Sequence, residues 1–244
     1  MPSLYQRDLA YIQAKGFGDF ARAAAPEIIR RLRSSTLDVR RVIDVGCGAG
    51  PLAKALVDAG FEVTGVDTSE ELLEFARLNV PNADFIRASA YDVQIPACDA
   101  VIALGEPLTY HADCSRADEL VGDFFRKVAD ALPSNGMLIF DVIGLGEPSL
   151  TARTWASGDD WAVLVDTTEN QEERTLVRNI EIFRYECEFY RRSNEVHRVR
   201  LFDVQKLRDQ LISIGFAVEI ADSYGAYPLL PRRHAFFATF GPQR

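Results

Sequence analysis

Three glycines and an acid stand together early in the chain, with the spacing of a ligand-binding turn. Residues 44–50 read DVGCGAG, so that Asp44 lies just ahead of Gly46 and Gly48. Glycine has no Cβ, so a turn that contains it can tighten and let a ligand approach the backbone. The helix expected after the turn offers free backbone N–H groups at its N-terminus. Many nucleotide-binding folds use such a turn, so it predicts a nucleotide or nucleoside ligand without deciding which.

A second acid, Asp67, narrows the choice of ligand. It ends an apolar run at Gly65-Val66-Asp67 and lies 21 residues after Gly46. A carboxylate at the end of a second strand is well placed to accept hydrogen bonds from both hydroxyls of a ribose. Pro51 follows the third glycine, so the dinucleotide spacing G-x-G-x-x-G is not completed. Together these residues predict a nucleoside ligand that lacks a diphosphate.

Residues able to move a proton follow a later apolar run. Glu106, Tyr110 and His111 stand in the segment GEPLTYH that begins at Gly105. Histidine titrates near neutral pH, so His111 is a candidate general base. The alternative is a solvated loop histidine.

A second polar segment, YRRSNEVH at residues 190–197, has the alternation of a strand. On a strand, Glu195 and His197 would lie on one face and Tyr190 on the other. The face with Glu195 and His197 would either line a substrate pocket or lie in solvent. Trp155 and Trp161 would either wall the same pocket or anchor this region in the core.

From Arg41 to Phe140 short apolar runs alternate with helical stretches, which predicts a parallel sheet covered by helices on both faces. We expect strands at Arg41–Val45, Phe61–Val66, Phe85–Ala88, Ala100–Leu104 and Met137–Val142, and helices at Pro51–Ala59, Glu70–Asn79 and Ala117–Leu132.

The pattern changes after about residue 144. Strand-like segments at 161–167, 176–184 and 189–201 predict an antiparallel insertion. A helix at Val204–Ile214, ended by Gly215, and strands at 216–221 and 235–240 follow. At the other end, residues 9–32 read as two helical pieces broken at residues 16–18. These pieces would either pack against the sheet or form a lid over the ligand.

The composition excludes several classes of protein. The net charge of −9 disfavours a nucleic-acid substrate, because phosphates need basic partners. The four cysteines form no C-x-x-C pair, so neither a zinc site nor a redox motif is expected, and we expect no bound metal. No apolar run is long enough to span a membrane. We therefore expect a cytoplasmic protein without a membrane partner.

The glycine run and the second acid carry a family resemblance. Residues 44–50 resemble the first motif of class I S-adenosylmethionine-dependent methyltransferases, and Gly65–Ser69 resembles their second motif. The resemblance extends more weakly through residues 85–91, 100–106 and 132–141. It implies a Rossmann-like α-β-α sandwich whose seven-stranded sheet is mostly parallel, with the last strand antiparallel. The β-rich insertion would follow the fifth strand.

The same resemblance implies the domain organisation and the role of each site residue. Residues 1–145 and 201–244 would form the cofactor-binding core with its helical lid, and residues 146–200 would cover the substrate. S-adenosylmethionine would be bound by Asp44, Gly46, Cys47, Gly48, Asp67, Thr68, Ser89, Ala90, Tyr91, Leu104 and Gly105. Many relatives place an acid at the position of Ser89, so the adenine contact stays open between Ser89, the backbone of residues 90–91 and Asp92.

The expected function is methyl transfer to an N, O or C atom of a small molecule. Tyr11, Tyr110 and Tyr190 are the expected substrate contacts, and His111, Glu106 and His197 are the candidate catalytic residues. Two alternatives stay open at this stage: a nicotinamide-dependent oxidoreductase, and a protein that binds S-adenosylmethionine without catalysis. The acceptor molecule and the oligomeric state do not follow from the residues.

Overall fold

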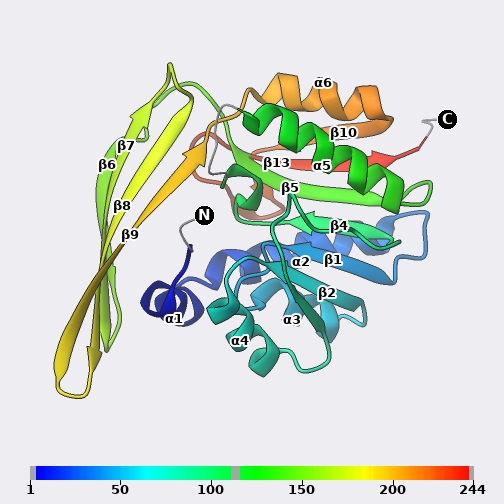
Figure 1. The fold of residues 1–244 in the computed structure, drawn as a ribbon. Coiled ribbons are helices and arrows are strands. Elements are labelled where there is room, and N and C mark those ends of the chain that lie inside the picture. The colour runs from blue at the N-terminus through cyan, green and yellow to red at the C-terminus, as the bar shows by residue number, and fades with distance from the viewer. Residues whose placement is uncertain (1–3, 111–115, 242–244) are drawn as a thin grey trace.

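The short apolar runs become the strands of one sheet, because each is buried on both faces and needs helices above and below. A computed structural model describes residues 4–110 and 116–241, which form a seven-stranded sheet, a four-stranded sheet beside it and a two-stranded ribbon (Figure 1). The strands of the large sheet are β1 (Arg41–Val45), β2 (Glu62–Asp67), β3 (Asp84–Arg87), β4 (Ala100–Ala103), β5 (Met137–Ile143), β10 (Phe216–Ala221) and β13 (Arg233–Phe240).

The order of the large sheet is β10-β13-β5-β4-β1-β2-β3. Strands β1 to β5 pair in parallel, whereas β13 runs antiparallel to both β5 and β10. The predicted fold, mostly parallel with an antiparallel last strand, is therefore confirmed. Because β1 lies in the middle of the sheet between β2 and β4, the loops after these strands meet at one edge, where open α/β sheets bind ligands.

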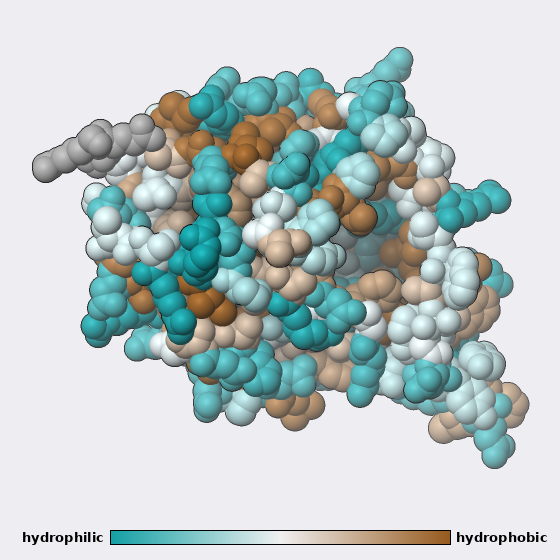
Figure 2. Space-filling model, turned by 180° about the vertical axis from the view of Figure 1, so that it is seen from behind, coloured by the Kyte–Doolittle hydropathy of each residue, from teal (hydrophilic) through white to brown (hydrophobic). Residues whose placement is uncertain are grey.

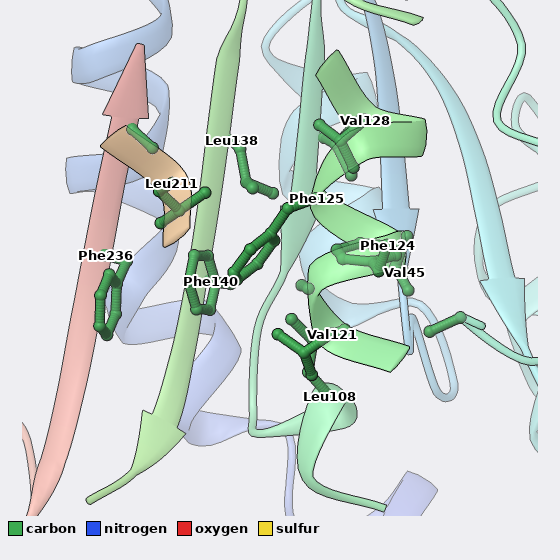
Figure 3. Packing of buried hydrophobic residues seen from close by; sticks show 14 of the residues in the cluster. Val45, Leu108, Val121, Phe124, Phe125, Val128, Leu138, Phe140, Leu211 and Phe236 are labelled. Atoms are coloured by element: carbon green, nitrogen blue, oxygen red, sulfur yellow. The ribbon is translucent and has the colours of Figure 1, made fainter. Parts of the chain in front are cut away.

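Helices cover both faces of this sheet (Figure 1). One face packs against α2 (Asp19–Ser34) and α3 (Pro51–Asp58), and the other against α5 (Ala117–Ala131) and α6 (Val204–Ile214). Strand β5 is buried along its whole length, as a central strand between two helical layers must be. In the layer beneath α5 and α6, the rings of Phe140 and Phe236 stack at 4.6 Å between centroids (Figure 3).

The helix boundaries follow local signals. Helix α3 begins with Pro51 behind the left-handed Gly50, and α4 (Glu70–Asn79) is capped by Ser69, whose Oγ accepts from the Leu72 N–H at 3.1 Å. Helix α6 ends at Gly215 in the left-handed conformation, as predicted. The N-terminal region forms α1 (Arg7–Gly16) and α2, and the break lies where the sequence places its glycines. A short 3-10 turn, η1 (Pro107–Thr109), follows β4.

The predicted insertion is a four-stranded antiparallel sheet that stands at one side of the core (Figure 1). Its strands are β6 (Ala152–Ser157), β7 (Trp161–Asn170), β8 (Thr175–Glu186) and β9 (Phe189–Arg200). One face packs on α1 through Trp161, Val163, Leu9 and Ile12. Trp161 therefore anchors the insertion, which is one of the two roles expected for it. The two-stranded ribbon β11 (Ser223–Tyr224) and β12 (Tyr227–Pro228) was not foreseen.

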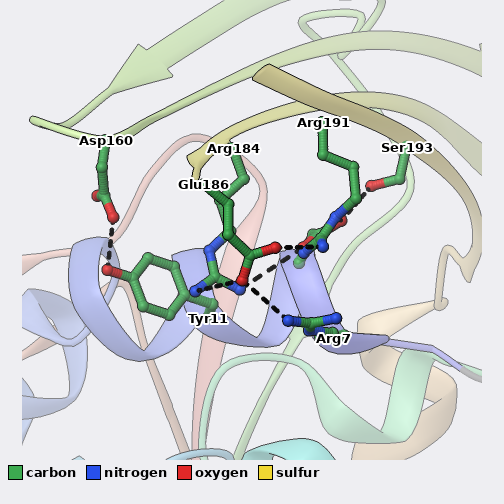
Figure 4. A network of polar contacts seen from close by, with 8 residues as sticks. Arg7, Tyr11, Asp160, Arg184, Glu186, Arg191 and Ser193 are labelled. Atoms are coloured by element: carbon green, nitrogen blue, oxygen red, sulfur yellow. Dashed lines mark hydrogen bonds and ion pairs between the residues drawn. The ribbon is translucent and has the colours of Figure 1, made fainter. Parts of the chain in front are cut away.

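A polar network fastens α1 to this sheet (Figure 4). Asp8 accepts from Arg191 Nε at 2.9 Å and from Ser193 Oγ at 3.0 Å, and Arg7 pairs with Glu186 at 2.9 Å.

Among the described residues no helix combines the length and the apolar character that a membrane crossing needs.

Candidate cofactor and acceptor site

The glycine turn after β1 depends on left-handed backbone. Gly46, Gly48 and Gly50 have φ of 71°, 55° and 82°, a region that other residues rarely adopt. The N–H groups of Gly46 and Cys47 donate to the Val66 carbonyl at 2.7 and 3.1 Å. These bonds hold the turn against the end of β2, so the two predicted motifs lie side by side.

Asp67 is fixed by backbone donors at the end of β2. Its Oδ2 accepts from the Gly48 N–H and its Oδ1 from the Ser69 N–H, both at 2.9 Å. Burial raises the pKa of this carboxyl above its ordinary value. The backbone donors lower the pKa, but their effect is smaller than that of burial. Ser69, and not Asp67, is the residue that caps α4.

Asp44 is a buried carboxylate with an unsatisfied oxygen. The residue is 2% exposed, and its Oδ2 has no hydrogen-bond partner within the described chain. Burial, with the nearby charge of Asp67 as a smaller cause, raises the pKa of Asp44 to about 7. A buried polar atom without a partner is rare and costs free energy, so it points to a ligand that would satisfy it.

A cavity of about 850 Å³ opens at this edge of the sheet. Figure 2 shows the surface hollowed beside the β6–β9 sheet. Every residue expected to bind the cofactor lines this cavity: Asp44, Gly46, Cys47, Gly48, Asp67, Thr68, Ser89, Ala90, Tyr91, Leu104 and Gly105. Asp92 is exposed and lies outside the lining, so it does not complete the site.

Glu106 does not lie in the cavity wall. Its carboxylate pairs with Arg178 Nη2 at 3.2 Å and with Arg233, and its side chain is buried. Each oxygen of this carboxylate accepts from a different guanidinium group, Oε2 from Arg178 and Oε1 from Arg233. Glu106 therefore forms ion pairs that anchor the loop after β4.

The sequence reasoning missed Asp141, near the end of β5. Its carboxylate accepts from the Gly105 N–H at 2.8 Å, the Glu106 N–H at 3.1 Å and the Tyr224 hydroxyl at 3.2 Å. Burial, followed by the charge of Glu106, raises its pKa to about 7. The available signal was an acid inside the otherwise apolar strand MLIFDVI. Asp141 holds the turn that carries Gly105 to the cavity.

Two tyrosines in the cavity wall form a polar pair. Tyr110, an expected substrate contact, lines the cavity together with Tyr5, which the sequence reasoning also missed. Their hydroxyl oxygens lie 3.5 Å apart, and Arg178 Nη1 donates to the Tyr110 hydroxyl at 2.9 Å. Burial and the neighbouring Tyr110 raise the pKa of Tyr5 well above its ordinary value.

His197 lies behind these tyrosines and does not line the cavity. It is 1% exposed, its ring contacts the rings of Tyr5 and Tyr110, and its Nε2 is 2.9 Å from Glu195 Oε2. Glu195 also accepts the backbone N–H groups of Tyr5 and Gln6, both at 2.8 Å. This strand face is thus neither solvated nor in the cavity wall; it supports the N-terminal segment.

The other expected contacts lie elsewhere. The Tyr11 hydroxyl donates to Asp160 Oδ2 at 2.7 Å at the junction of α1 and the insertion (Figure 4), and Tyr190 is exposed near the tip of the β8–β9 hairpin. Trp155 is 74% exposed, so it neither walls the pocket nor anchors the insertion in the core. His111 lies outside the described residues. No group of three or more metal-binding side chains is present among residues 4–110 and 116–241.

Comparison with known proteins finds methyltransferases in a family model, among sequence relatives and among solved structures. Residues 42–136 match a family model described as a methyltransferase domain. YqeM of Bacillus subtilis (strain 168), whose name carries the word methyltransferase, is 26% identical over 219 residues, which cover 84% of this chain and 86% of that protein.

Two solved structures share the fold over nearly the whole chain. An S-adenosylmethionine-dependent methyltransferase from Clostridium acetobutylicum ATCC 824 superposes with a TM-score of 0.79 at 18% identity, covering 96% of this chain and 98% of that one. The sugar N-methyltransferase KedS8 from Streptoalloteichus sp ATCC 53650 gives 0.77 at 20% identity, covering 95% and 92%. Residues 42–136 are therefore a methyltransferase domain, and the chain as a whole has the fold of S-adenosylmethionine-dependent methyltransferases.

Proposed function

We propose that this cavity binds S-adenosylmethionine at its glycine turn and a small-molecule acceptor beside the pair Tyr5 and Tyr110, and that the enzyme methylates an N, O or C atom of that acceptor. The observation that carries the proposal is the unsatisfied Oδ2 of buried Asp44 in the cavity wall. An ammonium group is the partner that such a carboxylate lacks. The resemblance to other methyltransferases supports the same reading.

The residues present fit the cofactor. Asp44 would hold its amino group, and Asp67 would accept from the ribose hydroxyls. A Cβ at Gly48 would meet nothing within 4 Å, so this turn leaves open space beside the cavity for a ligand. When bound, S-adenosylmethionine supplies an electrophilic methyl carbon on a sulfonium, open to in-line displacement by a nucleophile. The protein's task is then to bind, orient and exclude water.

The pair Tyr5 and Tyr110 is suited to orient a polar acceptor. Arg178 can only donate, so the Tyr110 hydroxyl accepts from it and must direct its own proton elsewhere. If Tyr110 donates to Tyr5, the Tyr5 proton is left for a ligand; if Tyr5 donates to Tyr110, the Tyr110 proton is left. Either arrangement presents one O–H donor, together with acceptor lone pairs that can bind an attacking hydroxyl or amine.

The size and lining of the cavity support a small acceptor. A volume of about 850 Å³ lies within the range of about 300–1,000 Å³ usual for small-molecule sites. Phe17 and Phe20, from the junction of α1 and α2, add apolar surface to the lining. KedS8 is named a sugar N-methyltransferase, which makes amino sugars one class to include in a screen. We further propose that the enzyme works in the cytoplasm.

Product formation tests this proposal. The enzyme is incubated with methyl-labelled S-adenosylmethionine and panels of amines, phenols, carboxylic acids and amino sugars, and both S-adenosylhomocysteine and labelled product are measured. Transfer to a panel member that is lost in Asp67→Ala supports the proposal. Tight cofactor binding without turnover on any panel would instead support a binding protein without catalysis, and preferential binding of NADH would support an oxidoreductase.

A further inference from the structure

The β6–β9 sheet contacts the tyrosine pair without lining the cavity. No residue of its four strands is in the cavity wall of the described chain. Strands β8 and β9 instead hold Tyr5 and Tyr110, which do line the cavity. Through these two tyrosines the sheet can influence an acceptor that it does not contact itself.

Three residues on one face of β8 and β9 make these contacts. The register pairs His197 with Arg178, and Glu195 lies two residues before His197 on the same strand, so the three side chains share a face. Arg178 Nη1 donates to the Tyr110 hydroxyl at 2.9 Å. The ring of His197 contacts the rings of Tyr5 and Tyr110, at 5.0 and 5.7 Å between centroids. The third residue, Glu195, binds the backbone of Tyr5.

The backbone of Tyr5 has a conformation that its surroundings must hold. Its φ of 51° lies in the left-handed region, which residues other than glycine rarely adopt and which persists only where neighbouring groups fix it. The Tyr5 N–H donates to Oε2 of Glu195 at 2.8 Å, and the Tyr5 carbonyl accepts from Ser69 Oγ at 2.8 Å. Glu195 and Ser69 therefore fix the backbone from which the Tyr5 ring extends.

Glu195 also binds the start of α1. Its Oε1 accepts from the N–H of Gln6, the N-cap residue of this helix, at 2.8 Å. The carboxylate thus binds two successive backbone N–H groups at a helix N-terminus, where the helix dipole favours a negative charge. Nε2 of His197, 2.9 Å from Oε2, holds the same carboxylate in place.

Other contacts attach the insertion to α1 without Glu195. Trp161 packs on α1, and Asp8 of that helix accepts from Arg191 Nε at 2.9 Å. None of these three residues lines the cavity. A change at Glu195 should leave these attachments in place, so its effect on Tyr5 can be separated from an effect on folding.

We propose that Glu195 is a positioning residue for acceptor binding, which acts through the backbone of Tyr5 and sets where the Tyr5 hydroxyl lies beside Tyr110. This inference rests on the proposed function, in which the two hydroxyl groups bind the acceptor. Their oxygens are 3.5 Å apart, at the long limit of a hydrogen bond, so a small shift of Tyr5 makes or breaks their contact. Such a shift changes the O–H donor that the acceptor meets and leaves the glycine turn unaltered.

The test is a double-mutant cycle of Glu195→Gln and Tyr5→Phe, with a panel acceptor that the wild type methylates. Glutamine has nearly the same shape, but its NH₂ group cannot accept, so one of the two backbone N–H groups loses its partner. Glu195→Gln should lower kcat/KM for the acceptor about tenfold and leave the affinity for S-adenosylmethionine nearly unchanged. In the Tyr5→Phe background it should lower kcat/KM no further, because the hydroxyl that it positions is gone. An equal loss in both backgrounds, or no loss in either, would overturn the proposal.

Asp8→Asn is the matched control, because it is another acid-to-amide change at a carboxylate that joins α1 to β9. It should lower the unfolding temperature and leave kcat/KM unchanged. A control that loses as much kcat/KM as Glu195→Gln would show that any loosening of α1 has this effect, and would overturn the specific role of Glu195.

Amide hydrogen exchange tests the position of Tyr5 without an acceptor. Exchange at the N–H groups of Tyr5 and Gln6 should be faster in Glu195→Gln than in wild type or Asp8→Asn. Equal exchange in the three proteins would overturn the proposal, even if the enzyme is active. A wild type that methylates no panel member would count against the proposed function, and hydrogen exchange would still decide whether Glu195 holds Tyr5. If circular dichroism shows that Glu195→Gln does not fold, Glu195→Asp, whose shorter side chain cannot reach both N–H groups, is measured with the same outcomes.

Discussion

The backbone N–H of Gly48 donates to Oδ2 of Asp67 at 2.9 Å, across the gap between the loop after β1 and the end of β2. This bond sets the distance between the glycine turn and the acid expected to hold the ribose. The two parts of the proposed cofactor site are therefore joined through the protein itself, and a change at either residue should affect both.

Gly48→Ala should weaken cofactor binding more than it weakens the fold. The added methyl group meets no protein atom within 4 Å, but it enters the cavity wall where the ligand is expected. Gly60→Ala is the matched control, because Gly60 also has positive φ and open space but lies outside the cavity lining. Each variant should lose about 1 kcal/mol of unfolding free energy from backbone strain. Calorimetry should show loss of S-adenosylmethionine affinity in Gly48→Ala alone; equal affinities would contradict the placement.

The affinity for S-adenosylmethionine should rise with pH up to about 7. Asp44 has a pKa of about 7, and only its ionised form attracts an ammonium group. Below that value, each pH unit should weaken binding by up to about tenfold. Asp44→Asn should bind weakly and lose this pH dependence. Titrations at about pH 6 and about pH 8 measure the effect; a wild-type affinity that is flat with pH would count against a role for Asp44.

The same substitution should stabilise the free protein at high pH. The folded-state pKa of Asp44 is raised above the ordinary value of 3.8, so the folded state binds this proton more tightly than the unfolded state does. The group's favourable contribution is therefore present below about pH 4 and is lost as pH rises through about 7. Asp44→Asn should unfold at a higher temperature than wild type at about pH 8, with the difference vanishing near about pH 4. A wild type that is more stable than the variant at high pH would argue that Oδ2 is satisfied in the protein.

Tyr110→Phe should reduce turnover and leave cofactor binding nearly unchanged. The variant lacks the hydroxyl that Arg178 orders, and with it part of the donor and acceptor set offered to the substrate. We expect kcat/KM to fall about tenfold or more. Tyr227→Phe, on β12 and outside the cavity lining, is the control and should behave as wild type. If both variants retain full activity, the acceptor does not contact Tyr110.

Local sequence signals predicted the core of this molecule well. The strand and helix alternation of residues 41–142, the glycine turn and the position of Asp67 depend on spacing within short segments, and the structure confirms the resulting fold. The three strands expected in the insertion also form, because their alternation has the period of a strand.

Contacts between distant segments were not predictable in this way. Tyr5 reaches the cavity because Glu195, 190 residues away, binds its backbone N–H. Glu106 is withdrawn from the cavity by Arg178 and Arg233, which belong to different sheets. Strand β6 was missed because its residues are largely exposed and show no apolar alternation. For Tyr5 and Glu106 the deciding partner lies far along the chain.

The most direct test of the account is a calorimetric titration of wild-type, Asp67→Ala and Asp84→Ala proteins with S-adenosylmethionine. Asp84 is an exposed acid on β3 outside the cavity lining and serves as the control. Charge-assisted hydrogen bonds are worth about 1.5–3 kcal/mol, so Asp67→Ala should bind at least about tenfold more weakly. Tight binding by wild type and Asp84→Ala, with the loss confined to Asp67→Ala, is the predicted result. Wild type that fails to bind S-adenosylmethionine, or Asp67→Ala that binds as tightly as wild type, would contradict the assignment of this cavity as the cofactor site.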